Sequence, residues 1–197
     1  MGPNYLLDEV LRMYFNDRQC GLLKEKIDND TDYGFKYFLT LTWGPRKLVE
    51  MRNSIIRRSP ELTDNEVDAE LLSWRIKQTR WFFIKLAQKA KSHPHLHPYW
   101  ALAPDHEHEH IHSLLLSTGK ILRREPRLLW EWGEQVDFKE YDPDYGMRHH
   151  GDDKRNAVRY IFSKHIAIPQ DLGPVCPGKR RSCRAGDCYL RRREFYK

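Results

Sequence analysis

The chain has 197 residues, of which 40% are hydrophobic, 12% aromatic and 31% charged, and its formal net charge is +6 at pH 7. These values are typical of a globular protein, and no apolar stretch reaches the roughly 18 residues of a transmembrane helix. Segment 1–15 contains acidic side chains and lacks the basic and apolar pattern of a signal peptide. We therefore expect a cytoplasmic protein that does not bind membranes.

Three elements are predicted in the first 57 residues. Apolar side chains at helical spacing predict a short helix over 4–15, which we assign to an N-terminal helical extension, 1–33. The aromatic and β-branched run 37–43 predicts a strand that Gly44-Pro45 ends. A short basic helix is expected over 47–57.

A long helix should follow, because Thr63 and Glu66 form the sequence of a capping box and apolar residues keep a helical period to about residue 91. Pro94 and Pro98 should end this helix, leaving His93, His95 and His97 as bystanders in a proline-broken connector. Strands are expected over 99–103 and 109–117, joined by a tight turn into an antiparallel hairpin.

The last predicted elements are a helix over 126–133 that ends on glycine, a strand over 135–141, and a helix over 152–166 that Pro169 ends. The order of elements predicts an α+β fold, an antiparallel sheet with helices packed against it. Tryptophans at these positions are expected to be mostly core, although Trp43, Trp100, Trp130 and Trp132 are candidates for stacking on bases.

Seven of the ten histidines lie between residues 93 and 112, and the run ends in His110-Ile111-His112 before an apolar strand. Alternate side chains of a strand share a face, so His110 and His112 should point the same way, about 7 Å apart along the strand. Two imidazoles at this spacing can bind one metal ion if a third ligand joins them.

If the turn spans Asp105 to His108, Ala103 pairs with His110 across the hairpin, and alanine cannot bind a metal. We favour His108 as the third ligand, because it shares the face of His110 if the strand extends back that far. The alternatives are Asp105 and His106 in the turn, and His97 on its approach.

The predicted helix over 152–166 contains Tyr160 and Lys164, which are four residues apart and therefore lie on one side of the helix. A phenol is a weak nucleophile at its ordinary pKa, near about 10. A neighbouring cation or metal favours the phenolate, which can attack a phosphodiester.

Three short motifs resemble those of the HUH endonucleases, the superfamily of rolling-circle replication initiator (Rep) proteins. Residues 38–42 (FLTLT) resemble the first motif, His110-Ile111-His112 the second, and Tyr160 with Lys164 the third, in which a single tyrosine is catalytic. The resemblance covers roughly 34–168, and we assign 34–170 to an HUH-type domain. Many such proteins separate the tyrosine and lysine by three residues rather than four, and often have a carboxylate near the position of Ala103.

The resemblance implies a metal-dependent, site-specific enzyme that nicks and rejoins single-stranded DNA. Its cofactor would be Mg²⁺ or Mn²⁺, and its intermediate a 5′-phosphotyrosine that starts rolling-circle replication of a plasmid or virus. Expected partners are a single-stranded or hairpin origin and, as further candidates, a host helicase or polymerase, in association with plasmid or nucleoid DNA. Two alternatives are a transposase or relaxase of the same chemistry and a non-catalytic DNA-binding protein.

The segment 171–197 forms the third predicted part, a basic tail. From Cys176 to Lys197 it has eight Lys/Arg and two Asp/Glu, a net charge of +6, so the rest of the chain is neutral. Its three cysteines are candidate ligands of a structural Zn²⁺ with His165 as the fourth. The candidate zinc ligands are Cys176, Cys183, Cys188 and His165. The candidate DNA-binding side chains are Arg159, Arg180, Arg181 and Arg184, which would contact phosphates.

Overall fold

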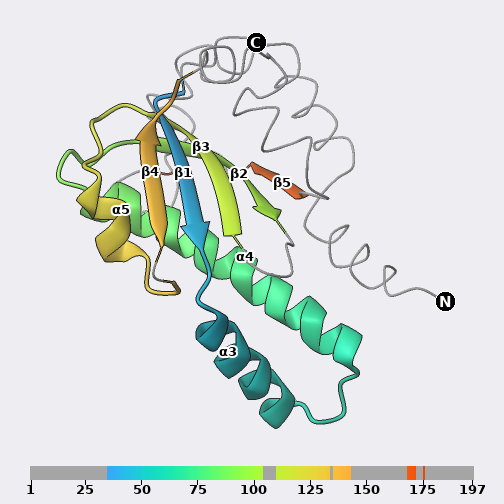
Figure 1. Ribbon diagram of the computed structural model, residues 1–197. Coiled ribbons are helices and arrows are strands. Elements are labelled where there is room, and N and C mark those ends of the chain that lie inside the picture. Colours follow the sequence, from blue (N-terminus) through green and yellow to red (C-terminus); the bar gives the residue numbers. More distant parts are fainter. Residues whose placement is uncertain (1–34, 104–109, 134, 143–167, 172–174, 176–197) are drawn as a thin grey trace.

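The fold is taken from a computed structural model of the chain, which describes residues 35–103, 110–133, 135–142, 168–171 and 175 (Figure 1). Five strands and three helices are described. In chain order they are β1 (Tyr37–Thr42), α3 (Pro45–Arg58), α4 (Asp64–Lys89), β2 (Leu96–Ala103), β3 (His110–Ser117), α5 (Arg124–Leu129), β4 (Val136–Glu140) and β5 (Ile168–Asp171).

The strands form one sheet in the order β4-β1-β3-β2-β5, and every neighbouring pair is antiparallel. The strand that carries the histidine motif, β3, is therefore the central one. The predicted α+β class, an antiparallel sheet with helices packed against it, is confirmed, and so is the β2–β3 hairpin pairing.

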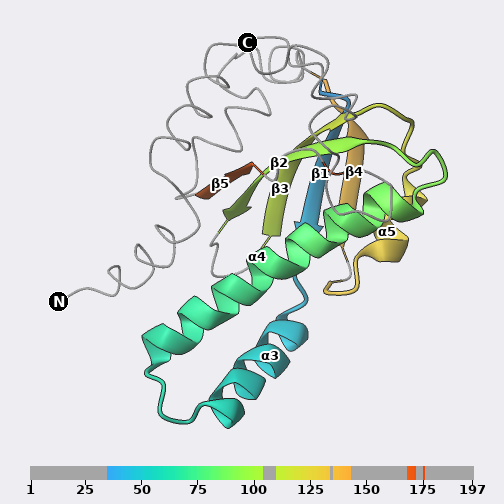
Figure 2. The ribbon, with the colours of Figure 1, turned by 180° about the vertical axis from the view of Figure 1, so that it is seen from behind.

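One face of the sheet is covered by the second half of α4 (Figure 2). Leu39 and Leu41 of β1 and Ile111 of β3 point to this face and are fully buried. They form the core with apolar side chains of α4 such as Phe83 and Leu86. The other face of β1 and β3 carries Phe38, Thr40, Thr42, His110 and His112, because side chains alternate along a strand.

The predicted start of α4 is confirmed. The Thr63 side chain accepts a hydrogen bond from the Glu66 backbone N–H, and the Glu66 carboxylate accepts one from the Thr63 backbone N–H at 2.7 Å. These two bonds satisfy N–H groups that the first turn of a helix leaves without helical partners. The Glu66 carboxylate also accepts a hydrogen bond of 2.7 Å from the Thr63 hydroxyl. This bond, followed by the one from the Thr63 backbone N–H, lowers the pKa of Glu66 below its ordinary value.

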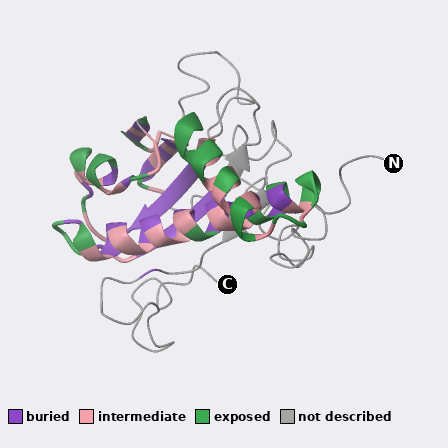
Figure 3. Ribbon diagram, turned by 90° about the horizontal axis from the view of Figure 1, so that it is seen from below, coloured by how far each residue is buried: buried purple, intermediate pink, exposed green. Residues whose placement is uncertain are grey.

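The helical pair α3 and first half of α4 extends beyond the sheet (Figure 1), and much of its outer surface is exposed (Figure 3). Arg52 of α3 joins the two helices through ion pairs of 2.7 Å with Asp64 and 3.4 Å with Asp68. The hydrogen bond to Asp64, followed by the charge of Asp68, raises the pKa of Arg52.

The helix predicted over 126–133 differs from the structure, since α5 is Arg124–Leu129 and ends four residues before Gly133. The chain leaves the helix because the Trp130 indole donates to the Thr42 carbonyl at 2.9 Å and the Gly44 N–H donates to the Trp132 carbonyl at 2.8 Å. Gly133 does not cap the helix. It lets the chain pass so close to β1 that a Cβ there would meet the Thr42 carbonyl oxygen at 1.7 Å.

The expectation that the tryptophans are mostly core is confirmed. Trp43, Trp100 and Trp130 are at most 5% exposed, and Trp132 is partly buried against the same core. The rings of Trp43 and Trp130 meet edge-on with centroids 4.8 Å apart, and those of Trp74 and Trp132 do so with centroids 4.9 Å apart.

The long helix ends at Lys89, before both prolines, but the strand expected over 99–103 begins earlier, at Leu96, so Pro98 lies within β2 and not in a connector. The Leu96 N–H donates to the Val175 carbonyl at 2.8 Å, on the side of β2 away from β3. Backbone nitrogens two residues apart in a strand point to the same side, so the Pro98 nitrogen, which has no hydrogen, also points away from β3. The pairing of β2 with β3 is therefore not interrupted at Pro98. His97 thus lies within a strand.

The sheet also contains β5, which the sequence analysis did not anticipate, with Pro169 inside it. An isolated bridge joins Val175 to Leu96. The described sheet pairing therefore continues past residue 170, where we placed the start of the basic tail. The division into three parts stays a prediction. The helices expected over 4–15 and 152–166 lie outside the described residues. In the described ranges, no helix has both the length and the apolar character required to cross a membrane.

Candidate functional site

The candidate site is the end of β3 on the face away from α4, where β3 pairs with β1 on one side and with β2 on the other. His110 pairs with Thr42 of β1 on one side and with Ala103 of β2 on the other. His112 likewise pairs with Thr40 and Ala101. The predicted pairing of Ala103 with His110 is confirmed, and the strand of the first motif lies directly beside that of the second.

His112 is held in place by two side chains of β1. Its Nδ1 shares a hydrogen bond of 3.0 Å with the Thr40 hydroxyl, and its ring packs on Phe38 with centroids 5.6 Å apart. The residue is buried, at 6% exposed. Thr40 is a functional candidate that the sequence analysis did not single out. The signal was its place in the Phe38–Thr42 motif, two residues after Phe38.

The two histidines are close enough to bind one metal ion. Their ring centroids are 4.5 Å apart, and the rings meet edge-on at 69°. Nitrogens that bind one ion at about 2 Å lie roughly 3 Å from each other, a separation that rings this close can supply. If Nε2 of His112 binds the ion, Nδ1 carries the proton and donates it to Thr40, as usual for metal-binding histidines. The donor chemistry of the pair therefore fits a divalent ion.

A third ligand is not found within the part of the chain that the structure describes, where no three His, Cys, Asp or Glu side chains gather into a metal site. Ala101 and Ala103 occupy the neighbouring positions of β2. The candidates His108, His106 and Asp105 lie in segment 104–109, outside the described residues, so the preference for His108 stays a prediction.

His97 is better explained as a core residue than as a ligand. It is 1% exposed, and its ring stacks on Tyr99 with centroids 4.4 Å apart. Four residues separate it from Ala101, the partner of His112, which corresponds to roughly 13 Å along the strand. The prediction that His97 belongs to a connector is corrected, whereas His93 and His95 do precede β2 as expected.

The remaining site predictions concern residues outside the described ranges. These are the catalytic candidates Tyr160 and Lys164, the zinc candidates Cys176, Cys183, Cys188 and His165, and the DNA-binding candidates Arg159, Arg180, Arg181 and Arg184.

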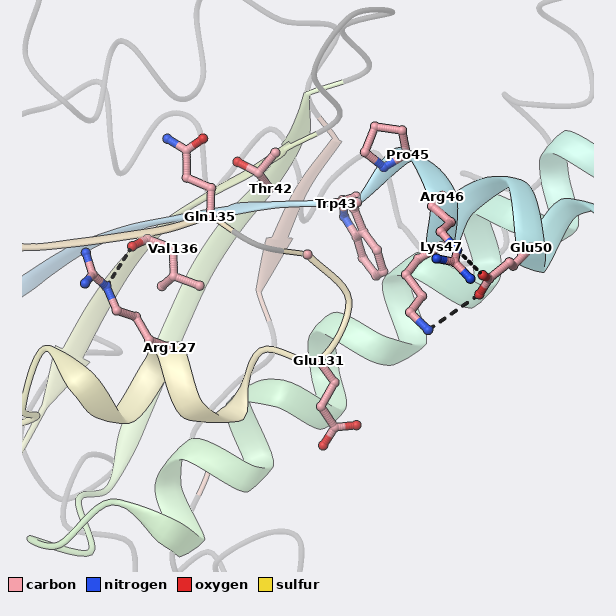
Figure 4. Close-up of a pocket in the computed structure, with 12 residues that line it drawn as sticks. Thr42, Trp43, Pro45, Arg46, Lys47, Glu50, Arg127, Glu131, Gln135 and Val136 are labelled. Carbon is pink, nitrogen blue, oxygen red and sulfur yellow. Dashed lines mark hydrogen bonds and ion pairs between the residues drawn. The ribbon is translucent and has the colours of Figure 1, made fainter.

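A pocket of about 920 Å³ lies where β1 ends and α3 begins (Figure 4). Thr42, the strand partner of His110, is part of its wall, and the cationic side chains Arg46, Lys47 and Arg127 line it. Arg46 and Lys47 share the Glu50 carboxylate, at 2.9 and 3.5 Å. The hydrogen bond from Arg46, followed by the charge of Lys47, lowers the pKa of Glu50.

The second carboxylate of this pocket, Glu131, is paired with Lys85 of α4 at 2.7 Å. Arg127 donates from Nε to the Val136 carbonyl at 3.4 Å, which holds the side chain along the wall (Figure 4). The pocket therefore has a positive balance of charge beside the histidine pair. The sequence predicts the basic helix, whereas its closeness to the partner of His110 depends on the tertiary structure.

Comparison with protein-family models, with curated proteins and with solved structures finds no match to this chain.

Proposed function

We propose that the protein is a metal-dependent endonuclease that nicks and rejoins single-stranded DNA to start rolling-circle replication. The observation that carries the proposal is the histidine pair of β3. His110 and His112 share one face of the central strand, their rings are 4.5 Å apart, and the hydroxyl of Thr40 bonds the nitrogen of His112 that would face away from a metal. The same strand contains the motif that resembles that of the HUH endonucleases.

In this proposal His110 and His112 hold Mg²⁺ or Mn²⁺ with a third ligand from segment 104–109. The bound ion would polarise the scissile phosphate and stabilise the charge that develops on it. The hydrogen bond between the Thr40 hydroxyl and His112 Nδ1 would hold the ring in the tautomer that leaves Nε2 for the ion.

The nucleophile in the proposal is Tyr160, whose ionised form Lys164 would favour. The phenolate oxygen attacks the phosphorus, and the bond from phosphorus to the 3′ oxygen breaks. The DNA 5′ end is then joined to the tyrosine, and the free 3′-OH can prime synthesis. When a 3′-OH later attacks the phosphotyrosine, the phenolate leaves and the strand is rejoined, so no external energy source is needed.

The experiment is a search for the covalent adduct. The protein is incubated with Mn²⁺ and a labelled pool of single-stranded and hairpin oligonucleotides, and the products are separated under denaturing conditions. Tyr160→Phe should abolish the adduct while DNA binding persists, and the control Tyr145→Phe should retain it. An adduct that survives in Tyr160→Phe would disprove the assignment of the nucleophile.

A second candidate is a non-catalytic DNA-binding protein. The burial of His112 favours it, because a histidine that is 6% exposed, bonded to Thr40 and packed on Phe38 also suits a purely structural role. The absence of any adduct from the unmutated protein, across the whole pool with Mn²⁺, would favour this candidate.

We also propose a structural zinc site formed by three thiols of the tail, Cys176, Cys183 and Cys188, with His165 as the fourth ligand. It is supported by the grouping of three thiols within thirteen residues, 176–188, of a basic segment. Metal analysis of the purified chain should find about one zinc per molecule, and a Cys183→Ser variant should lose it.

A further inference from the structure

The exposed surface of α3 is strongly basic. We call its exposed cations Arg46, Lys47, Arg57 and Arg58 the α3 basic surface; in the described structure their one carboxylate partner is Glu50. The fifth cation of the helix, Arg52, is partly buried and paired with two aspartates of α4. The ion pairs that join α3 to α4 thus leave the outer cations exposed.

This basic surface starts beside the histidine pair and leads away from it. Helix α3 begins three residues after Thr42, the strand partner of His110. Its 14 residues make it about 21 Å long, at 1.5 Å per residue. The Arg46–Lys47 pair lines the pocket at the near end, and the Arg57–Arg58 pair lies near the far end, where the helical pair extends beyond the sheet (Figures 1 and 4).

The side chains of α3 suit the phosphates of a duplex better than unpaired bases. The two cationic pairs are eleven residues apart, roughly 16 Å along the helix, which is the length of about five base-pair steps. Proteins that bind single strands stack the bases on aromatic side chains, and α3 has no aromatic residue. Cations without aromatics contact the backbone irrespective of sequence.

We propose that the α3 basic surface binds the phosphate backbone of double-stranded DNA that flanks the nicked strand, such as the stem of a hairpin. This inference rests on the proposed function for its biological setting, but its charge argument does not require the nicking reaction. The duplex would lie along α3, and its unpaired continuation would reach the end of β3 where His110 lies.

The test compares two variants, each of which changes two arginines that are neighbours in the sequence. Arg57→Gln with Arg58→Gln removes two charges from the α3 basic surface. The matched control, Arg123→Gln with Arg124→Gln, removes two exposed charges at the start of α5. This control site lies near the C-terminal end of α4: the backbone N–H of Lys91, just after α4, donates a hydrogen bond of 2.7 Å to the carboxylate of Glu125 in α5. Glutamine is a good helix former, so both variants should fold, which circular dichroism checks.

The measurement is fluorescence anisotropy of a labelled duplex of generic sequence, titrated at about 0.05 to 0.2 M salt. Each phosphate contact contributes about 0.9 to the slope of log K against log salt. The α3 variant should therefore reduce the slope by about two and weaken binding by roughly 10- to 100-fold at 0.1 M salt. The α5 control should keep the slope of the unmutated protein.

Equal losses in the two variants, or no duplex binding by the unmutated protein at low salt, would overturn the inference. The adduct assay on an unpaired oligonucleotide separates it from the proposed function. If α3 mediates duplex binding, the α3 variant keeps this adduct. If the unmutated protein forms no adduct but its duplex binding depends on Arg57 and Arg58, the nicking proposal fails and the inference about α3 stands.

Discussion

Gly133→Ala should destabilise the protein strongly, because the glycine lies against the backbone of β1. An added Cβ would be 1.7 Å from the Thr42 carbonyl oxygen and 2.8 Å from its carbon. The obstacle is main chain in a paired strand, so it cannot rotate away as a flexible side chain can. Either the segment around Gly133 or the end of β1 must move by more than 1 Å to restore an ordinary contact of about 3.3 Å.

Two hydrogen bonds depend on this close approach. They join the Trp130 indole to the Thr42 carbonyl at 2.9 Å and the Gly44 N–H to the Trp132 carbonyl at 2.8 Å. Their loss at about 1 kcal/mol each, with some loss of packing around Trp130, gives an expected decrease of roughly 2 to 4 kcal/mol in the free energy of unfolding.

Urea denaturation followed by tryptophan fluorescence measures this decrease. The matched control is Gly44→Ala, where a Cβ would meet the Trp132 carbonyl oxygen at 3.3 Å, a contact that a shift of a few tenths of an ångström relieves. This variant should lose less than about 1 kcal/mol. The reasoning is refuted if Gly133→Ala is as stable as Gly44→Ala.

Two further predictions test the site and the start of α4. Thr40→Val should reduce the free energy of unfolding by about 1 kcal/mol. If His112 binds the ion, this variant should also bind Mn²⁺ roughly tenfold or more weakly in calorimetry. Thr42→Val is the control, and an unchanged Mn²⁺ affinity of the Thr40→Val variant would contradict the metal role of His112. The capping box should make stability depend on pH, because the pKa of Glu66 is lower in the folded protein than its ordinary value of 4.5. Its contribution is therefore complete above about pH 4.5 and is lost as the pH falls through the lowered folded pKa. Thermal unfolding between about pH 6 and 3 should show a smaller loss of stability in Thr63→Ala than in the unmutated chain, and parallel curves would contradict this sign.

Local sequence signals predicted elements whose causes are themselves local. The start of α4 follows from the reciprocal bonds of Thr63 and Glu66, and alternation along β3 itself places His110 and His112 on one face. A turn fixes the register of the strands it joins, so the pairing of Ala103 with His110 could be predicted once the turn was assumed to span Asp105 to His108.

Predictions failed where a distant segment decided the outcome. Pro98 is tolerated in β2 because its nitrogen, which has no hydrogen, faces away from β3. The Leu96 N–H, two residues earlier and on the same side of the strand, donates to Val175 and not to β3. Gly133 suggested a helix end, but its role is a close approach to Thr42, which is distant in the sequence.

The sequence by itself determined the α+β class, the helical and strand periods and the common face of the two histidines, since these depend on residues a few positions apart. Only the tertiary structure decided that β1 lies beside β3, so that Thr40 bonds His112, and that the cations at the start of α3 line a pocket beside the partner of His110. The physical reason is that strand order depends on which surfaces are buried together across the whole chain, and no local pattern encodes that choice.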